Sequence, residues 1–178
     1  MKYFKKIFEL DPKEVEAFIV DEVKAQMKRN AGGKDISDEL KDYDIEIHWF
    51  PVYSEFRADI EPKLETKDYK HFYFKGSKDL TAGEYFHLAS EHYHYYFAEI
   101  YGLMTGKPVC YSTLGTCIRS RDGYQFIINK EHVTIIYDLV KHEYFIQNWD
   151  EENDKEILRP VSDDTKEMIE KCIEEMRG

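Results

Sequence analysis

The longest patterned stretch of the chain, residues 81–105, reads TAGEYFHLASEHYHYYFAEIYGLMT. Thr81 and Glu84 form a capping box, in which each side chain accepts a hydrogen bond from the other residue's backbone N–H at the start of a helix. Apolar side chains then recur every three or four residues as far as Met104, and a glycine and a proline follow as stop signals. The pattern predicts a helix over residues 82–104 with a wide apolar face.

The same stretch holds residues that two backbone conformations would combine into two different metal sites. In a helix, His87, Glu91 and His94 lie at i, i+4 and i+7 on one face, where two imidazoles and a carboxylate could bind a divalent metal. In a strand, His92 and His94 lie on one side at i and i+2. The His92-Tyr93-His94 triplet resembles the His-hydrophobic-His metal motif of rolling-circle replication and relaxase nucleases. That resemblance implies a metal-dependent nuclease with a tyrosine nucleophile.

The alternative to both metal sites is that these histidines only help to build the fold, and we favour this alternative. The HExxH motif of zinc proteases is absent from the sequence. Histidines beside tyrosines on an amphipathic helix usually lie at the edge of the core, with the ring packed and one nitrogen hydrogen-bonded. The sequence therefore predicts no metal and no cofactor.

The 178-residue chain has a net charge of −11, and this charge is unevenly distributed. Residues 1–68 carry 12 basic and 17 acidic side chains, residues 69–146 carry 8 of each, and residues 147–178 carry 5 basic and 11 acidic side chains. The excess negative charge therefore lies at the two ends, around a neutral middle that is rich in aromatic residues. Such a chain is not expected to bind nucleic acid directly, because that binding uses a basic face.

Length and cysteine content predict a single domain over residues 1–178 in a reducing compartment. A chain of this length buries a core without disulfides. Cys110, Cys117 and Cys172 are odd in number and match no zinc spacing, which favours free thiols. No apolar run is long enough for a signal-peptide core or a membrane span. These features predict a cytoplasmic protein with no membrane partner.

Local signals predict the elements before residue 81. A short amphipathic helix is expected within residues 1–10, and Asp11 caps a second helix that begins at Pro12 and ends at a Gly-Gly pair. Alternating apolar residues over 44–60 predict a β-hairpin or a bent strand. Residues 71–75 read as a third short strand.

After Pro108 the alternation typical of strands continues as far as residue 149, with a tight turn predicted at Arg121-Asp122-Gly123. Residues 150–156 are predicted to form a solvated acidic loop. Ser162 then caps a last helix, whose apolar stripe consists of Met168, Ile169, Cys172, Ile173 and Met176. The predicted fold is α+β in the order α-β-β-β-α-β-β-β-β-α, with a largely antiparallel sheet of about 5 to 7 strands covered by three helices.

No residue carries a recognisable catalytic motif. Cys110 and Cys117 fall in a predicted strand without a base or a nucleophile turn, so we expect small core side chains there. His132 and His142 lie near predicted turns and could each meet a carboxylate, Asp138 or Glu143. Because such pairs are common on surfaces, a non-enzymatic protein is the preferred interpretation.

The acidic ends favour a non-enzymatic protein-binding inhibitor whose surface imitates the charge of a nucleic acid. The expected partner is a basic, nucleic-acid-binding protein such as a host nuclease, and the expected source is a phage or a mobile element that evades host defence. The carboxylates predicted to contact the partner are Asp150, Glu151, Glu152, Asp154, Glu156, Glu167, Glu170 and Glu174.

Two alternatives stay open. The first is a metal-dependent hydrolase or nuclease that uses His87, Glu91, His92 and His94. The second is an accessory or immunity-type partner protein without charge mimicry, in which the acidic surface serves solubility alone.

Overall fold

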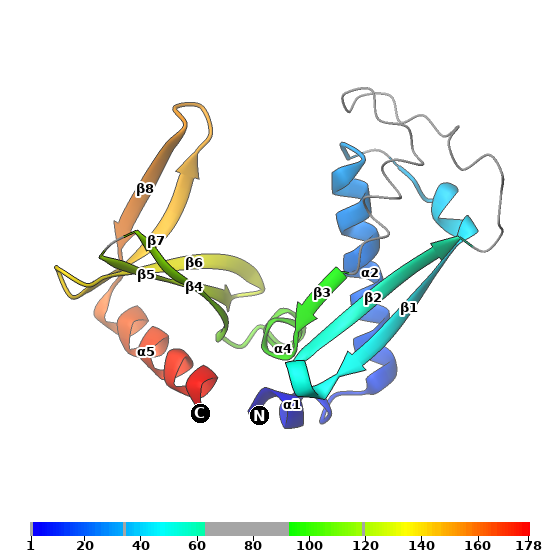
Figure 1. Ribbon diagram of the computed structural model, residues 1–178, viewed down its shortest axis with the longest axis horizontal. Helices are drawn as coiled ribbons and strands as arrows, with labels where there is room; N and C mark the ends of the chain where they lie inside the picture. Colours follow the sequence, from blue (N-terminus) through cyan, green and yellow to red (C-terminus); the bar gives the residue numbers. More distant parts are fainter. Residues whose placement is uncertain (1, 34, 63–92, 119) are drawn as a thin grey trace. The chain divides into compact units, whose positions relative to one another are not determined.

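The computed structural model describes residues 2–33, 35–62, 93–118 and 120–178 (Figure 1). The described residues belong to two compact units. One unit combines the two ends of the chain, within residues 1–9 and 96–178, and the other lies within residues 10–95. The single domain expected over residues 1–178 stays a prediction.

The first unit is built on a five-stranded antiparallel sheet in which the strands lie in chain order, β4-β5-β6-β7-β8. The strands are β4 (Val109–Ile118), β5 (Arg121–Ile128), β6 (Glu131–Asp138), β7 (Glu143–Asp150) and β8 (Lys155–Pro160). Asn129 and Lys130, which connect β5 to β6, both have positive φ, at 54° and 65°. Positive φ at both central positions is typical of the two-residue hairpin turn whose twist matches that of the strands.

Helix α5 (Asp163–Arg177) covers one face of this sheet. Ser162 begins it as predicted, because its Oγ accepts a hydrogen bond from the Thr165 backbone N–H at 3.3 Å. The core beneath α5 joins the helix stripe to side chains of three strands: Ile169, Cys172 and Ile173 pack with Cys110, Tyr124, Phe126 and Ile135. The predicted last helix and its apolar stripe are confirmed.

Helix α4 (Phe97–Thr105) covers the other face, since it packs on Ile127, whose side chain points away from that of Phe126. Gly102 makes this approach possible: a Cβ atom there would lie 2.5 Å from Val109 Cγ2 and 2.9 Å from Ile127 Cβ. Helix α1 (Lys2–Ile7) packs on α4 through two aromatic contacts. The ring centroids of Phe4 and Phe97 are 5.4 Å apart, and those of Tyr3 and Tyr101 are 6.0 Å apart.

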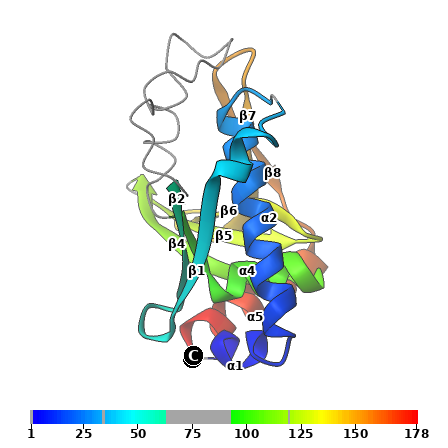
Figure 2. The same ribbon diagram turned by 90° about the vertical axis from the view of Figure 1, so that its right-hand side faces the viewer.

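The second unit packs helix α2 (Pro12–Asn30) on a three-stranded sheet of order β1-β2-β3 (Figure 2). The strands are β1 (Tyr43–Phe50), β2 (Glu55–Pro62) and β3 (Tyr93–Tyr96), and two short 3-10 helices, η1 (Glu39–Asp42) and η2 (Pro51–Tyr53), flank β1. Asp11 caps α2 by accepting a hydrogen bond from the Lys13 N–H at 2.9 Å. The buried stripe of α2 consists of Val15, Ile19, Val23 and Met27. The predicted second helix and the hairpin over 44–60 are confirmed.

The predicted helix over residues 82–104 is wrong over 93–96, which form β3 beside β2. Tyrosines favour strands, and the edge of β2 offers backbone hydrogen bonds, so the sheet outweighs the helical period there. The helix begins only at Phe97, where Glu99 accepts a hydrogen bond from the Tyr96 N–H at 3.5 Å. The Thr81–Glu84 capping box and the strand predicted at 71–75 lie outside the described residues.

The turn predicted at Asp122-Gly123 is also wrong, because both residues lie inside β5 and β4 pairs with them. Gly123 faces Gly115, whose φ of 71° accompanies an irregularity in the β4 register. Irregularities of this kind take up extra residues in one strand, and β4 accordingly extends to Ile118 while β5 already begins at Arg121. The fold class itself, α+β with antiparallel sheets, is confirmed.

The predicted acidic loop over 150–156 is shorter than expected. Asp150 ends β7 and Lys155 already begins β8, a strand that the sequence pattern did not reveal. Ile157 and Leu158 are consecutive apolar residues, so β8 lacks the alternation by which strands are recognised.

Candidate functional site

The connection between β7 and β8 is an acidic turn held in place by one of its own carboxylates. Asp150 accepts hydrogen bonds from Asn153 Nδ2 at 2.8 Å and from the backbone N–H groups of Asn153 and Glu152 at 3.3 and 3.2 Å. These hydrogen bonds lower the pKa of the Asp150 carboxyl below its ordinary value, and the bond from the Asn153 side chain contributes most. Glu151, Glu152 and Asp154 are exposed. The turn therefore presents negative charge on an ordered backbone.

Trp149 lies beside this turn with 58% of its surface exposed. It is the last residue of β7 before Asp150, and it pairs across the hairpin with Glu156. Tryptophan is among the residues that contribute most to the binding energy of protein interfaces. The sequence did not reveal Trp149 as a site residue, because alternation along a strand does not show which face other elements cover. We define the acidic hairpin tip as Trp149, Asp150, Glu151, Glu152 and Asp154.

Glu156, also predicted to contact a partner, has partners within the sheet. Its carboxylate accepts hydrogen bonds from Gln147 Nε2 at 2.7 Å and from Arg121 Nη1 at 2.9 Å. The Gln147 bond, and then the arginine, lower the pKa of Glu156 below its usual range. This carboxylate holds the hairpin next to its turn, opposite Trp149, and its role toward a partner stays a prediction.

The remaining predicted contact residues, Glu167, Glu170 and Glu174, are exposed on α5. Figure 1 shows the β7–β8 tip extending away from the sheet on the side remote from α5, and Figure 2 agrees. The structure therefore separates the predicted acidic surface into two groups, the hairpin tip and the exposed carboxylates of α5.

Of the predicted metal ligands, only His94 is described, and His87, Glu91 and His92 lie outside the described residues. His94 lies on β3 with Nδ1 3.2 Å from Glu55 Oε2 on β2. Arg57 binds the other oxygen of Glu55 at 3.2 Å. Within the described ranges, no group of three or more histidine, cysteine, aspartate or glutamate residues is placed to hold a metal ion. The metal site stays a prediction.

Asp138 and His142, two members of the predicted acid–base pairs, shape the turn between β6 and β7. The Asp138 carboxylate accepts hydrogen bonds from the N–H groups of Val140 and Lys141 at 2.9 and 3.0 Å. The Lys141 bond is the largest cause of the lowered pKa of Asp138. His142 Nδ1 lies 3.2 Å from the Tyr137 hydroxyl. The Asp138 carboxylate therefore has a structural role in this turn.

His132 joins a polar chain that the sequence did not reveal. Its Nε2 lies 3.7 Å from Oε1 of Glu99, a carboxylate with 7% exposure on α4, and its Nδ1 lies 3.1 Å from the Tyr111 hydroxyl. Burial, and then the charge of Glu99, raise the pKa of Tyr111 above its ordinary value. Tyr111 is thus a neutral phenol at physiological pH.

The two described thiols are buried. Cys110 has 0% and Cys172 has 4% exposure. Burial raises the pKa of Cys110 to about 12 and also raises that of Cys172. Because the thiolate is the reactive form, neither cysteine is suited to nucleophilic catalysis, as the sequence suggested for Cys110. The side chain of Cys117 lies outside the described residues.

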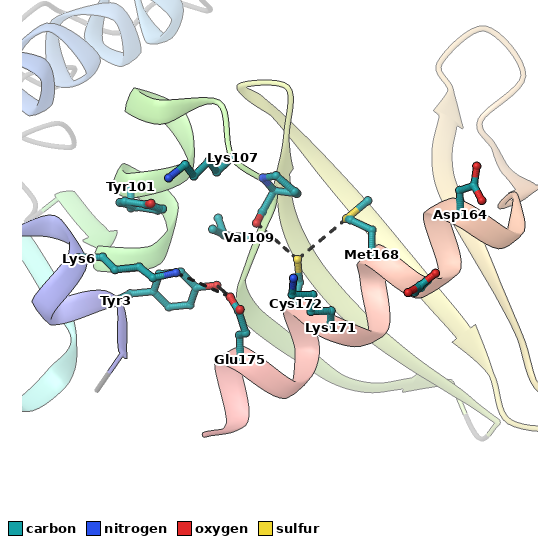
Figure 3. A pocket seen from close by; sticks show the side chains of 12 residues that line it. Tyr3, Lys6, Tyr101, Lys107, Val109, Asp164, Met168, Lys171, Cys172 and Glu175 are labelled. Atoms are coloured by element: carbon teal, nitrogen blue, oxygen red, sulfur yellow. Dashed lines mark hydrogen bonds and ion pairs between the residues drawn. The ribbon is translucent and has the colours of Figure 1, made fainter.

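A cavity of about 540 Å³ opens among α1, α4 and α5 of the first unit (Figure 3). Its floor is apolar and comes from Pro108, Val109, Met168 and Cys172. Two tyrosines and three lysines stand around it, namely Tyr3, Tyr101, Lys6, Lys107 and Lys171. Three carboxylates, Asp164, Glu167 and Glu175, complete the lining. No sequence pattern indicated this cavity, because its walls come from both ends of the chain.

None of the helices in the described part of the chain combines the length and the apolar character that a membrane crossing requires. Comparison with known proteins gives no relative: no family model, no curated protein and no solved structure matches the chain. Function must therefore be argued from the residues themselves.

Proposed function

We propose that the protein is a non-enzymatic inhibitor that inserts its acidic hairpin tip into a basic groove of another protein. The observation that carries this proposal is the 58% exposure of Trp149 beside the carboxylates of the tip. An aromatic side chain that becomes buried on binding supplies affinity, and surrounding charges of complementary sign supply orientation and a fast on-rate.

The charge of the tip suggests the kind of groove. Glu151, Glu152 and Asp154 are exposed, and the hydrogen bonds that lower the pKa of Asp150 keep its carboxylate charged even in mild acid. Four carboxylates within five residues resemble the charge density of a phosphate backbone, so a groove built for nucleic acid is complementary to them. The proposed partner is a basic nucleic-acid-binding protein, such as a host nuclease blocked by a phage or mobile-element protein.

The two described thiols of the first unit support a role in binding rather than nucleophilic catalysis. Burial raises the pKa of Cys110 and of Cys172, so both thiols stay protonated at neutral pH. Each of these groups would need a lowered pKa or an activating base to act as a nucleophile.

Affinity capture from a host lysate identifies the partner, and charge reversal then tests the surface. We expect the Glu151→Lys/Glu152→Lys/Asp154→Lys variant to bind more than tenfold more weakly, a loss of more than about 1.4 kcal/mol of binding free energy. The matched variant Glu167→Lys/Glu170→Lys/Glu174→Lys changes the net charge equally on α5, and we expect its affinity to change by less than about twofold, or less than 0.5 kcal/mol. Equal losses in both variants would show that net charge, not the tip, determines binding.

Two further measurements separate inhibition from solubility. If electrostatic attraction steers the two proteins together, the on-rate should fall as ionic strength rises above roughly 0.1 M, where the screening length is about 10 Å. Trp149→Ala should weaken binding without changing this salt dependence, because it removes contact area and no charge. If the reversals at the tip cause aggregation while affinity is unchanged, the acidic surface serves solubility and the proposal is wrong.

A further inference from the structure

We propose that the cavity among α1, α4 and α5 binds a small organic anion that joins an apolar or aromatic body to a carboxylate or a phosphate. Its volume of about 540 Å³ is within the range of small-molecule sites. Such sites typically combine an apolar lining with a few convergent polar groups, and this cavity has both.

The anionic group of the ligand is expected at the Tyr101 end of the cavity, where the ammonium groups of two lysines lie near one ring. Lys6 Nζ lies 5.5 Å from the centre of the Tyr101 ring, and Lys107 Nζ lies 5.7 Å from it. The two lysines come from different elements, α1 and the connection from α4 to β4. Figure 3 shows Lys107 and Lys6 on opposite sides of this ring, so each lysine offers a separate cationic contact to an anion at this end of the cavity.

The neighbouring carboxylate, Glu175, is shared and pairs with only one of these two lysines. Lys2 Nζ binds it at 3.0 Å and the Tyr3 hydroxyl at 3.1 Å, and Lys6 Nζ forms a longer ion pair with it at 3.9 Å. The Lys2 bond is the main cause of the lowered pKa of Glu175, and the charge of Lys6 contributes to it. Lys107 forms no ion pair with any residue in the described ranges.

The body of the ligand is expected to lie along the floor between α4 and α5. Val109 and Cys172 are 1% and 4% exposed, and Met168 continues the apolar surface along α5. Figure 3 shows Asp164 at the end of the cavity remote from Tyr3 and Tyr101. The cavity is therefore cationic at the tyrosine end and acidic at the opposite end, which orients an elongated anion.

The probe for this site is 8-anilinonaphthalene-1-sulfonate, an aromatic anion whose fluorescence rises in an apolar site. With the full chain we expect one saturable site, and in Lys6→Gln/Lys107→Gln a dissociation constant at least about fivefold larger, since two charged contacts are lost. Lys166→Gln is the matched control, because Lys166 is exposed on α5 and does not line the cavity. Its dissociation constant should equal that of the unchanged protein.

Far-ultraviolet circular dichroism and melting temperature show whether the double variant is folded. If the folded double variant binds the probe as tightly as the control does, or if the unchanged protein does not bind it, the proposal is overturned. Displacement then identifies the source of the anion: dodecanoate displaces the probe if the natural ligand is a fatty carboxylate, and adenosine monophosphate does so if it is a nucleotide. If neither displaces it, the assignment of a carboxylate or phosphate ligand is wrong.

Discussion

Arg121 of β5 donates a hydrogen bond to the carboxylate of Glu156 on β8 at 2.9 Å, although β6 and β7 lie between these two strands in the sheet. The sheet must therefore curl enough to bring charged side chains of its second and fifth strands into contact. Gln147 on β7 binds the same carboxylate at 2.7 Å. Together these bonds anchor the β7–β8 hairpin at Glu156, the residue that pairs with Trp149.

The Arg121–Glu156 pair should contribute measurably to stability. Both side chains are only partly exposed, at 26% and 29%, so solvent screens the pair incompletely. We expect a double-mutant cycle of Arg121→Gln and Glu156→Gln in urea to give a coupling energy of about 0.5 to 1 kcal/mol. Arg159→Gln, at an exposed position on β8, serves as the control. A coupling energy of zero would mean that the contact is not held in solution.

Lowered pH should weaken the same contact. Because the pKa of Glu156 is lowered in the folded state, its stabilisation is fully present above the unfolded value of about 4.3 and is lost as pH falls through the folded value. The difference in unfolding free energy between the unchanged protein and Glu156→Gln should therefore shrink below about pH 4. Urea midpoints at neutral and acid pH measure it, and a constant difference would contradict the expectation.

Gly102→Ala should destabilise the first unit although alanine favours helices by about 1 kcal/mol over glycine. The new Cβ would lie 2.5 Å from Val109 Cγ2, which forces α4 away from the sheet. We expect a loss of about 1 to 3 kcal/mol in urea unfolding. Adding Val109→Ala removes the nearer obstacle and should cost less in the Gly102→Ala background than in the unchanged protein. A gain in stability for Gly102→Ala would show that α4 does not approach so closely.

Helices α2 and α5 could be predicted from the sequence because their signals are local. Asp11 and Ser162 cap them, and their apolar stripes repeat within a few residues. Strands β3 and β8 could not be predicted, because a strand depends on the neighbour with which it pairs. At residues 93–96 the helical period and the strand preference competed, and pairing with β2 decided the outcome.

Some features of the candidate sites could likewise be predicted from local sequence, and others depend on the fold. The acidic turn was visible as a run of carboxylates in the sequence. The exposure of Trp149, the burial of Glu99 and the internal partners of Glu156 depend on which elements cover each face. The cavity could not be predicted either, because Tyr3 and Glu175 meet only after the two ends of the chain have folded together.

The environment of Trp149 can be tested without a partner. The Trp49→Phe variant leaves Trp149 as the single tryptophan. Exposed carboxylates attract cations and repel anions. The ratio of quenching by caesium to quenching by iodide should therefore be higher for Trp149 than for free tryptophan amide. The Glu151→Lys/Glu152→Lys/Asp154→Lys reversal should invert this preference. Equal quenching before and after reversal would place these carboxylates too far from the indole to act with it.

Cys110 and Cys172 should resist thiol reagents in the folded protein. With a pKa of about 12, roughly one Cys110 in ten thousand is a thiolate at about pH 8. In the Cys117→Ser variant we expect no reaction with 5,5′-dithiobis(2-nitrobenzoate) until denaturant is added, when both thiols should react. Rapid reaction of one thiol in the native protein would show that its site opens to solvent.

The first unit is discontinuous in the chain: α1 comes from residues 2–7 and its partner α4 from residues 97–105, so the whole second unit is inserted between them. During synthesis α1 leaves the ribosome long before α4 has been made, so it cannot pack on its partner at once. Residues 10–95 are fully synthesised before α4 is. The meander of β4 to β8 follows with short-range pairings that form quickly. Docking of α1 on α4 closes a long loop and should be a late step of folding, with an entropic cost that grows only slowly with the length of the insertion.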